Sequence, residues 1–193
     1  MTSSYLALLD TGYAGMGPMK STAYIGLGSN LASSAGNPAE TVRAAMGALS
    51  EIGTVTAISS LYQTEPVGYR EQPYFINAVA RVATEFEPEE LLGQLLEIER
   101  AFGRDRRLSI PKGPRTLDLD LLLVFQNDSQ DAITYDAPLL KLPHPEIANR
   151  RFVLEPLAEV APELRHPASG KTIRRLLEEH LDSGGAEEEV TRL

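Results

Sequence analysis

Two aspartates lie within one of the most apolar segments of the chain. Residues 116–125 read TLDLDLLLVF, and this density of Leu, Val and Phe predicts a buried β-strand. Side chains alternate between the two faces of a strand, so Asp118 and Asp120 share one face, with their Cα atoms about 6.8 Å apart. The opposite, core-facing side is predicted to hold four leucines: Leu117, Leu119, Leu121 and Leu123.

Two carboxylates held side by side on such a strand repel each other unless positive charge lies near them. Mg²⁺ meets this need, because it is commonly bound by one or two carboxylates together with substrate phosphates. Paired carboxylates can also hold two metal ions about 4 Å apart across a phosphoryl transfer. The alternative is an exposed strand whose acids face water, and the spacing of Asp118 and Asp120 alone does not choose between the two.

A concentrated basic segment precedes this strand. Residues 100–115 contain one acid, Asp105, and six basic residues: Arg100, Arg104, Arg106, Arg107, Lys112 and Arg115. The whole chain has a net charge of -9, so this local excess suits a polyphosphate better than a nucleic-acid duplex. A lone basic run is usually a solvated loop, but next to two aspartates it favours metal-assisted phosphoryl transfer, which depends on positioning and charge stabilisation.

The order of predicted elements indicates an α+β fold. Strands are predicted over 23–27, 54–62, 74–82 and 116–125, and helices over 38–50 and 88–102. Their order is β-α-β-β-α-β, which is typical of a ferredoxin-like core. Beyond this core we expect extra strands and helices: a hairpin across 127–131 and helices near 150–160 and 172–181.

The chain length of 193 residues is typical of a single domain. We expect a catalytic domain over 21–182, a disordered extension over 1–20 and a loose tail over 183–193. The sequence contains no cysteine and no apolar run of about 18 residues, so neither disulfides nor a membrane-spanning helix are expected. A cytoplasmic monomer is the expected form.

Other candidate residues are weaker signals when taken singly. Phe75 and Asn77 share one face of their strand and could bind a flat heterocycle, although a core aromatic beside a polar edge is the commoner arrangement. Phe152 is open to the same two interpretations. An ordinary surface glutamate is the favoured interpretation of Glu99. The Gly26-Leu-Gly28-Ser-Asn30 segment lacks the features of a nucleotide-binding loop and predicts a turn at the end of a strand.

Four segments together resemble the 6-hydroxymethyl-7,8-dihydropterin pyrophosphokinases. In chain order they are AYIGLGSNL, TEPVGYREQPYFINAV, GPRTLDLDLLL and LPHPEIANRRFVLEPLAEVAPEL, and the resemblance extends over roughly 23–180. It implies a folate-pathway enzyme that moves pyrophosphate from MgATP to the hydroxymethyl group of a dihydropterin, with release of AMP.

The resemblance also implies roles for individual residues. Asp118 and Asp120 match the aspartates that bind two magnesium ions, and Arg104 and Arg115 match the catalytic arginines that engage the phosphates. The positions similar to ATP-binding residues are Glu99, Arg106, Lys112, Arg115, His144 and Arg150. Those similar to the pterin pocket are Thr64, Pro66, Val67, Phe75, Asn77 and Phe152, with the ring between the two phenylalanines.

Two other classes of protein are compatible with parts of the pattern. A binding module on the same fold, such as a sensor or an RNA-binding domain, is opposed by the acidic net charge and by the paired aspartates. Another metal-dependent nucleotidyl or phosphoryl transferase would not need Phe75, Asn77 and Phe152 together. The expected partners are therefore ATP and a dihydropterin alcohol, without nucleic acid or membrane.

Overall fold

The computed structural model describes residues 21–106, 110, 112–126, 132–185 and 188–193. The predicted extension over 1–20 and the predicted hairpin across 127–131 lie outside these residues. On either side of that gap, Phe125 and Ala132 form an isolated antiparallel bridge.

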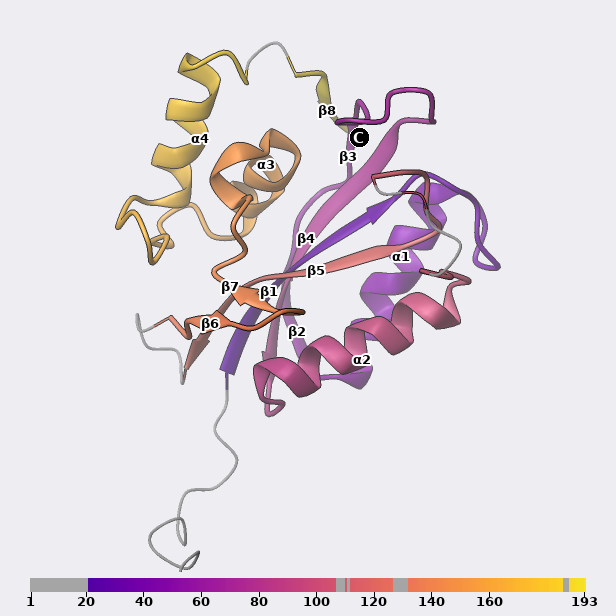
Figure 1. Ribbon diagram of the computed structural model, residues 1–193, viewed down its shortest axis with the longest axis horizontal. Helices are drawn as coiled ribbons and strands as arrows, with labels where there is room; N and C mark the ends of the chain where they lie inside the picture. The colour runs from indigo at the N-terminus through magenta and orange to yellow at the C-terminus, as the bar shows by residue number, and fades with distance from the viewer. Residues whose placement is uncertain (1–20, 107–109, 111, 127–131, 186–187) are drawn as a thin grey trace, which may run out of the picture.

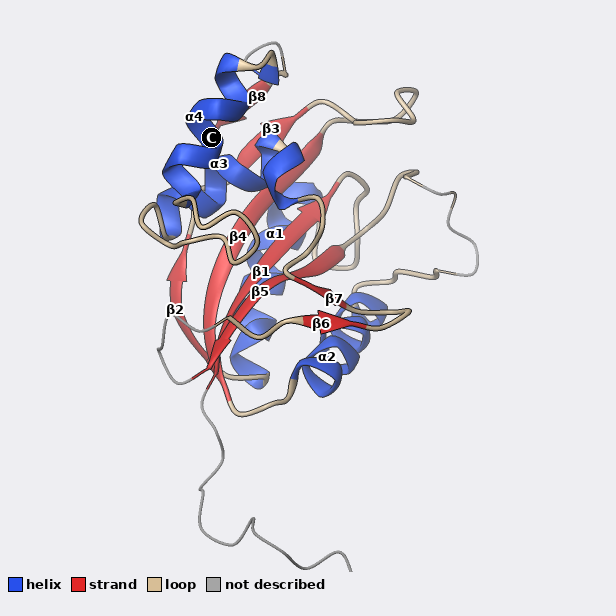
Figure 2. Cartoon of the chain, turned by 60° about the vertical axis from the view of Figure 1, so that its left-hand side comes forward, coloured by secondary structure: helices blue, strands red, loops and turns tan. Residues whose placement is uncertain are grey.

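A six-stranded sheet with antiparallel pairing runs through the molecule (Figure 2). Its strands are β1 (Ser21–Ser29), β2 (Thr54–Ile58), β3 (Tyr62–Thr64), β4 (Phe75–Thr84), β5 (Asp118–Gln126) and β8 (Val190–Arg192). Their order is β5-β1-β4-β3-β8, and β2 also pairs with β4. The longest strands, β1, β4 and β5, therefore form the centre and one edge of the sheet.

Helices cover both faces of this sheet, so that its long strands β1, β4 and β5 are mostly buried. The α-helices are α1 (Pro38–Ala48), α2 (Pro88–Ala101), α3 (Arg151–Val160) and α4 (Ile173–Asp182). Figure 1 shows α1 and α2 on one side and α3 and α4 on the other. Short elements complete the chain: the 3-10 helices η1 (Leu49–Glu51) and η2 (Ile147–Asn149), and the pair β6 (Tyr135–Asp136) and β7 (Lys141–Leu142).

The start of α1 follows directly from its sequence. The Asn37 side chain accepts hydrogen bonds from the backbone N–H groups of Ala39 (3.0 Å) and Glu40 (3.1 Å). In return, Glu40 Oε2 accepts from the Asn37 N–H at 2.8 Å, and Pro38 occupies the first helical position. This reciprocal cap satisfies N–H groups that the helix cannot pair by itself.

A bulge in β5 corrects one detail of the predicted strand. Leu117, Leu119 and Leu121 lie in the core beneath α1 and α2, as predicted. Leu123 instead belongs to the core beneath α3 and α4. The register with β1 shifts at this point, leaving Leu122 as an extra residue, and an extra residue reverses the faces of those that follow it.

Two further predictions about strands were wrong. The strand predicted over 54–62 is two strands, β2 and β3, because the chain leaves the ladder at Ser59, whose hydroxyl accepts from the Val79 N–H at 2.9 Å. The tail predicted to be loose from Ser183 contains β8, which pairs with β3. Pairing with a distant strand depends on tertiary contacts that local composition does not report.

The described helices are too short or too polar for any of them to cross a membrane.

Candidate active site

Asp118 and Asp120 lie on the side of β5 that faces α3 and α4. Their neighbours across the sheet are Gly28 and Gly26, which belong to β1. A Cβ atom on Gly28 would lie 3.0 Å from Oδ1 of Asn77 and 3.9 Å from Cβ of Asp118. The predicted turn begins later than expected: both glycines lie within β1, which ends at Ser29. The missing side chain of Gly28 leaves room beside Asp118 and Asn77.

Asp118 is surrounded by arginines of the basic segment. Arg104 Nη1 donates to Oδ1 of Asp118 and also to the Leu117 carbonyl, the latter at 2.8 Å. Arg115 Nε lies 3.1 Å from Oδ2, and Arg106 Nη2 lies 3.9 Å from Oδ1. The structure thus brings the predicted arginines and this carboxylate together, and the arginines compensate its charge.

Glu99 is buried, with 1% of its side chain exposed, which corrects the interpretation as a surface residue. It accepts from Arg106 Nε at 2.9 Å, from Arg106 Nη2 at 2.8 Å and from the Leu119 N–H at 2.8 Å. Burial raises the pKa of Glu99, although the Leu119 hydrogen bond and the Arg104 charge oppose the shift. Its carboxylate joins the end of α2 to β5 and orients Arg106.

Asp120 differs from Asp118 in its electrostatic environment. Among the described residues it forms no ion pair within 4.0 Å. Burial raises the pKa of Asp120, the negative charge of Asp118 raises it further, and the charges of His144 and Arg150 oppose the shift. Burial lowers the pKa of His144, against the attraction of Asp120. Of the two aspartates, Asp120 is therefore the one whose negative charge is not balanced by an ion pair with a neighbouring cation among the described residues.

The two carboxylates fit a magnesium ion that arrives with its own further ligands. The described residues contain no cluster of three or more His, Cys, Asp or Glu side chains able to hold a metal. Mg²⁺ keeps several waters and is commonly bound by one or two carboxylates plus phosphate oxygens. Asp118 and Asp120 therefore suit a metal–nucleotide complex better than a metal held by protein alone.

A cavity of about 150 Å³ opens beside this charged cluster. Its lining includes five residues of the predicted pterin set: Thr64, Val67, Phe75, Asn77 and Phe152. The sixth residue, Pro66, lines a neighbouring cavity that shares Thr64, Val67 and Phe152. Lys112, Arg115 and Arg150 of the predicted ATP set also line the first cavity, so the two predicted sites adjoin.

Cations lie over both aromatic walls of this cavity. The guanidinium carbon of Arg115 lies 4.9 Å from the centre of the Phe75 ring, and that of Arg150 lies 5.7 Å from the centre of the Phe152 ring. Asn77 Nδ2 donates to Thr64 Oγ1 at 2.7 Å, which fixes the orientation of the buried amide. A flat heterocycle between the phenylalanines would thus meet a positioned amide at its edge and arginines at its mouth.

Backbone hydrogen bonds help to fix the positions of His144 and Lys112. The His144 N–H donates to the Leu122 carbonyl at 2.9 Å, and its Nδ1 accepts from the Glu146 N–H at 3.3 Å. Lys112 has a φ of 58°, an uncommon conformation for a residue with a side chain. Its carbonyl accepts from Gln72 Nε2 at 2.9 Å.

The sequence predictions missed Asn30, which is buried with 2% exposure. Its Oδ1 accepts from the Arg115 N–H at 2.7 Å, and its Nδ2 donates to Gln72 Oε1 at 3.0 Å and to the Pro73 carbonyl at 3.1 Å. Asn30 therefore connects the start of the Arg115–Asp120 segment to the loop before β4. Its position directly after an apolar strand could have indicated that Asn30 has a structural role.

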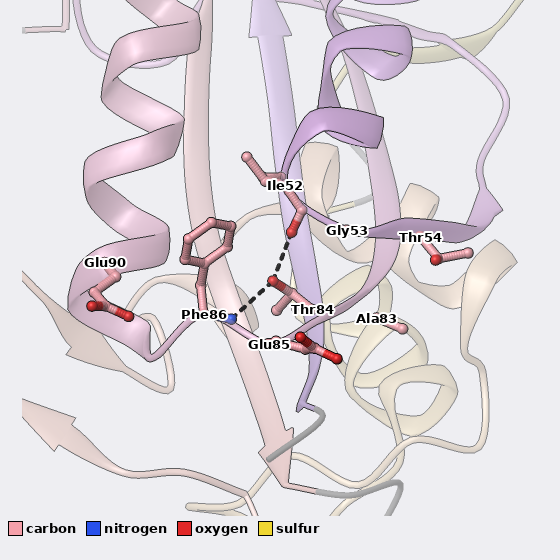
Figure 3. A pocket seen from close by; sticks show the side chains of 8 residues that line it. All are labelled: Ile52, Gly53, Thr54, Ala83, Thr84, Glu85, Phe86 and Glu90. Carbon is pink, nitrogen blue, oxygen red and sulfur yellow. Dashed lines mark hydrogen bonds between the residues drawn. The ribbon is translucent and has the colours of Figure 1, made fainter. Parts of the chain in front are cut away.

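A larger cavity, of about 560 Å³, lies at the other end of β1 and β4. Figure 3 shows its eight lining residues, where the Thr84 hydroxyl lies between the Ile52 carbonyl and the Phe86 N–H. The charged side chains among the eight are Glu85 and Glu90. They would repel phosphates, so volume alone does not identify the nucleotide site.

Comparisons with known proteins give one consistent family. Residues 24–162 match the family described as 7,8-dihydro-6-hydroxymethylpterin-pyrophosphokinase (HPPK). A Pseudomonas aeruginosa protein named 2-amino-4-hydroxy-6-hydroxymethyldihydropteridine pyrophosphokinase is 42% identical over 156 residues, covering 80% of this chain and 88% of the relative. A Bacillus subtilis protein of the same name is 39% identical over 153 residues, covering 78% of this chain and 84% of the relative.

Solved structures agree at the level of the fold. The wild-type Plasmodium falciparum HPPK-DHPS superposes with a TM-score of 0.66 at 16% identity, covering 90% of this chain. The present chain spans 46% of that protein's length. The shared architecture is a mixed α+β fold with an antiparallel sheet.

Proposed function

The chain belongs to the 7,8-dihydro-6-hydroxymethylpterin-pyrophosphokinase family, and we propose that its charged cluster and its aromatic cavity bind the two substrates of that family's reaction side by side. The enzyme is a 2-amino-4-hydroxy-6-hydroxymethyldihydropteridine pyrophosphokinase of folate biosynthesis. It transfers pyrophosphate from ATP to the hydroxymethyl group of the dihydropterin and releases AMP.

Asp118 and Asp120 are the proposed ligands of two magnesium ions that arrive with ATP. The bound ions would neutralise the phosphate oxygens and polarise the reacting centre. The support is the electrostatic environment of the pair: Asp120 is partly buried beside Asp118, and two like charges so placed favour a cation between them.

Arg104 and Arg115 are the proposed catalytic arginines. Both already contact Asp118, so each can reach a phosphate that is held by metal on this carboxylate. The remaining proposed contacts to ATP come from Arg106, Lys112, His144 and Arg150. Glu99 would act through Arg106, since its carboxylate accepts from that guanidinium and from the backbone of β5.

The aromatic cavity is the proposed pterin slot. Phe75 on β4 and Phe152 on α3 would stack on the two faces of the ring, and Asn77 would hydrogen-bond its edge. Thr64 orients Asn77, while Pro66 and Val67 enclose the slot from the loop before β4. Arg115 lies over Phe75 and therefore adjoins both substrates.

In the proposed step the hydroxymethyl oxygen attacks the β-phosphorus of ATP in line. The new O–P bond forms as the bond from the β-phosphorus to the α,β-bridging oxygen breaks, and AMP leaves with that electron pair. The hydroxyl proton passes to solvent. Arg104 and Arg115 stabilise the charge that develops on the migrating group, which is the main way proteins catalyse such transfers.

The observation that carries this proposal is the contact of Arg115 with both Asp118 and Phe75. The test is a turnover assay with MgATP and 6-hydroxymethyl-7,8-dihydropterin, with identification of the nucleotide product. AMP in a 1:1 ratio to pterin pyrophosphate is expected, and ADP or free pyrophosphate as the main product would contradict the proposal. Calorimetric titration with the pterin, with and without a non-hydrolysable MgATP analogue, would test the two subsites separately.

The strand order also supports the finer classification of the fold. With β2 and β3 counted as one interrupted strand beside β4, the sheet has the order expected for a β-α-β-β-α-β core. We therefore propose a ferredoxin-like catalytic domain that begins at residue 21 and, because β8 pairs with β3, extends beyond 182.

A further inference from the structure

The far end of α3 is fixed to the sheet by a single carboxylate. Glu159 Oε2 accepts from the Tyr62 hydroxyl at 2.8 Å and from the Ser60 N–H at 3.0 Å. Its Oε1 accepts from the Ser60 hydroxyl and from Arg192 Nη2, both at 3.0 Å. Arg192 Nε also donates to Ser60 Oγ at 2.9 Å. Four donors from β3, β8 and the break before β3 thus converge on one residue of α3.

These contacts satisfy groups that the sheet leaves unpaired. Ser60 lies where the chain leaves the ladder between β2 and β3, so its N–H needs another acceptor. Burial raises the pKa of Tyr62 to about 12, and Glu159 adds to the shift. Burial alone would raise the pKa of Glu159, but the hydrogen bonds from Tyr62 and Ser60 outweigh it and lower the pKa. Glu159 is therefore a charged acceptor and Tyr62 a neutral donor at neutral pH.

The same elements carry the walls of the proposed pterin slot. Phe152 and Glu159 are seven residues apart on α3, which is about two turns, so they lie on the same side of the helix. On β3, Tyr62 pairs directly with Asn77, and Thr64 pairs with Phe75. Tyr62, Glu159 and Arg192 do not line the slot cavity, so any effect on the pterin must pass through these walls.

We propose that Glu159, with Tyr62 and Arg192, is a positioning cluster that fixes the gap between Phe152 on α3 and the Phe75–Asn77 edge of the sheet, and so sets the affinity for the pterin. This inference rests on the proposed function of the slot. Buried Val153, Leu154 and Leu157 hold α3 on the sheet, but apolar packing is non-directional. The cluster supplies directional contacts at the far end of the helix, as the hydrogen bond from Arg151 Nη1 to the Glu188 carbonyl (2.7 Å) does at its start.

The cluster contributes more to geometry than to stability. Arg192 is 63% exposed and Glu159 is 27% exposed, and exposed ion pairs contribute little to the free energy of unfolding. Stacking and hydrogen bonding of a small ring, in contrast, are sensitive to displacements of about 1 Å in the walls. Loss of the cluster should therefore weaken pterin binding while the protein remains folded.

The test is calorimetric titration of Glu159→Gln with 6-hydroxymethylpterin in the presence of a non-hydrolysable MgATP analogue. We expect the Kd for the pterin to rise about three- to tenfold, the Kd for the nucleotide to stay unchanged and the Tm to fall by no more than about 2 °C. Tyr62→Phe, which removes one hydroxyl and keeps the ring, should give a smaller rise. The matched control is Glu163→Gln, which removes an exposed acid bound to Arg174 at 2.9 Å and should change neither Kd.

Three results would overturn the inference. The first is that Glu159→Gln and Tyr62→Phe bind the pterin as the wild type does. The second is that both variants lose pterin and nucleotide affinity equally, together with a large fall in Tm, which would indicate general destabilisation. The third is a wild-type protein that does not bind the pterin at all, in which case the proposed function fails and this inference with it. Normal wild-type binding with unaffected variants would overturn the positioning role alone.

Discussion

Arg104 donates to the Asp118 carboxylate and, through the same nitrogen, to the Leu117 carbonyl. The Arg104 side chain is 10% exposed and that of Asp118 is 16% exposed. The negative charge of Asp118, which we propose binds metal, is thus balanced by Arg104, which we propose binds phosphate. When MgATP binds, the contact between Arg104 and Asp118 would be exchanged for two others: Asp118 would bind the metal, and Arg104 would bind the nucleotide.

The two aspartates should differ in their effect on stability. Asp118→Ala removes the partner of a nearly buried guanidinium, so we expect a loss of about 1–3 kcal/mol in the free energy of unfolding. Asp120→Ala removes a like charge that has no ion-pair partner among the described residues, so its stability should be unchanged or higher. Both variants should lack pyrophosphoryl transfer. Urea denaturation without magnesium measures the difference, and an equal loss in the two variants would contradict it.

Arg104 and Arg115 should separate kinetically. Arg104→Ala is expected to slow the chemical step by about 100-fold or more with little change in the Kd for MgATP, because its contact with the migrating group forms only after the exchange. Arg115→Ala should also weaken both ligands, since Arg115 lies over Phe75. Single-turnover kinetics and calorimetry measure these effects.

The control for both variants is Arg100→Ala. Arg100 belongs to the same basic segment but pairs with Glu97 on the exposed surface of α2. Its removal should leave turnover and affinity unchanged. An Arg104 variant whose whole defect is in nucleotide affinity would contradict the assigned role.

The sequence predicted those parts of the fold that depend on local pattern. The start of α1 at Pro38 follows from Asn37 and Glu40, which lie within four residues of each other. The shared face of Asp118 and Asp120 follows from the two-residue period of a strand, and it is confirmed up to Leu121. Beyond that point the extra residue in β5 places Leu123 on the other face. The local composition does not predict this bulge.

What the sequence did not predict depends on distant contacts. Glu99 resembles a surface residue because it lies in a charged last turn of α2, between Glu97 and Arg100, yet the basic segment and β5 close over it. The pairing of β8 with β3 joins residues more than a hundred positions apart. Asn30 acquires its role only when Arg115 and the loop before β4 come to it.

Asp120 should make stability without metal depend on pH. Burial and the Asp118 charge raise the pKa of Asp120 above 3.8 in the folded protein, so the folded state binds this proton more tightly than the unfolded state. Its ionisation therefore costs stability as pH rises through the raised pKa. Asp120→Asn should be more stable than the wild type at pH 7, with a difference that shrinks toward pH 4. Denaturation curves across this range measure it, and a constant difference would contradict the prediction.

Gly28 and Gly26 offer a matched test of the space beside Asn77. A Cβ atom on residue 28 would lie 3.0 Å from Oδ1 of Asn77, whereas one on residue 26 would lie 3.5 Å from Leu122 Cδ1, which is an ordinary contact. Gly28→Ala should therefore displace the Asn77 amide and raise the Kd for the pterin about tenfold or more, since a misplaced hydrogen-bonding group leaves its partner unpaired. Gly26→Ala should bind the pterin as the wild type does and gain a few tenths of a kcal/mol, because alanine loses less entropy than glycine in a strand. Calorimetry with 6-hydroxymethylpterin measures both, and equal pterin affinities in the two variants would show that the amide beside Gly28 does not read the ring.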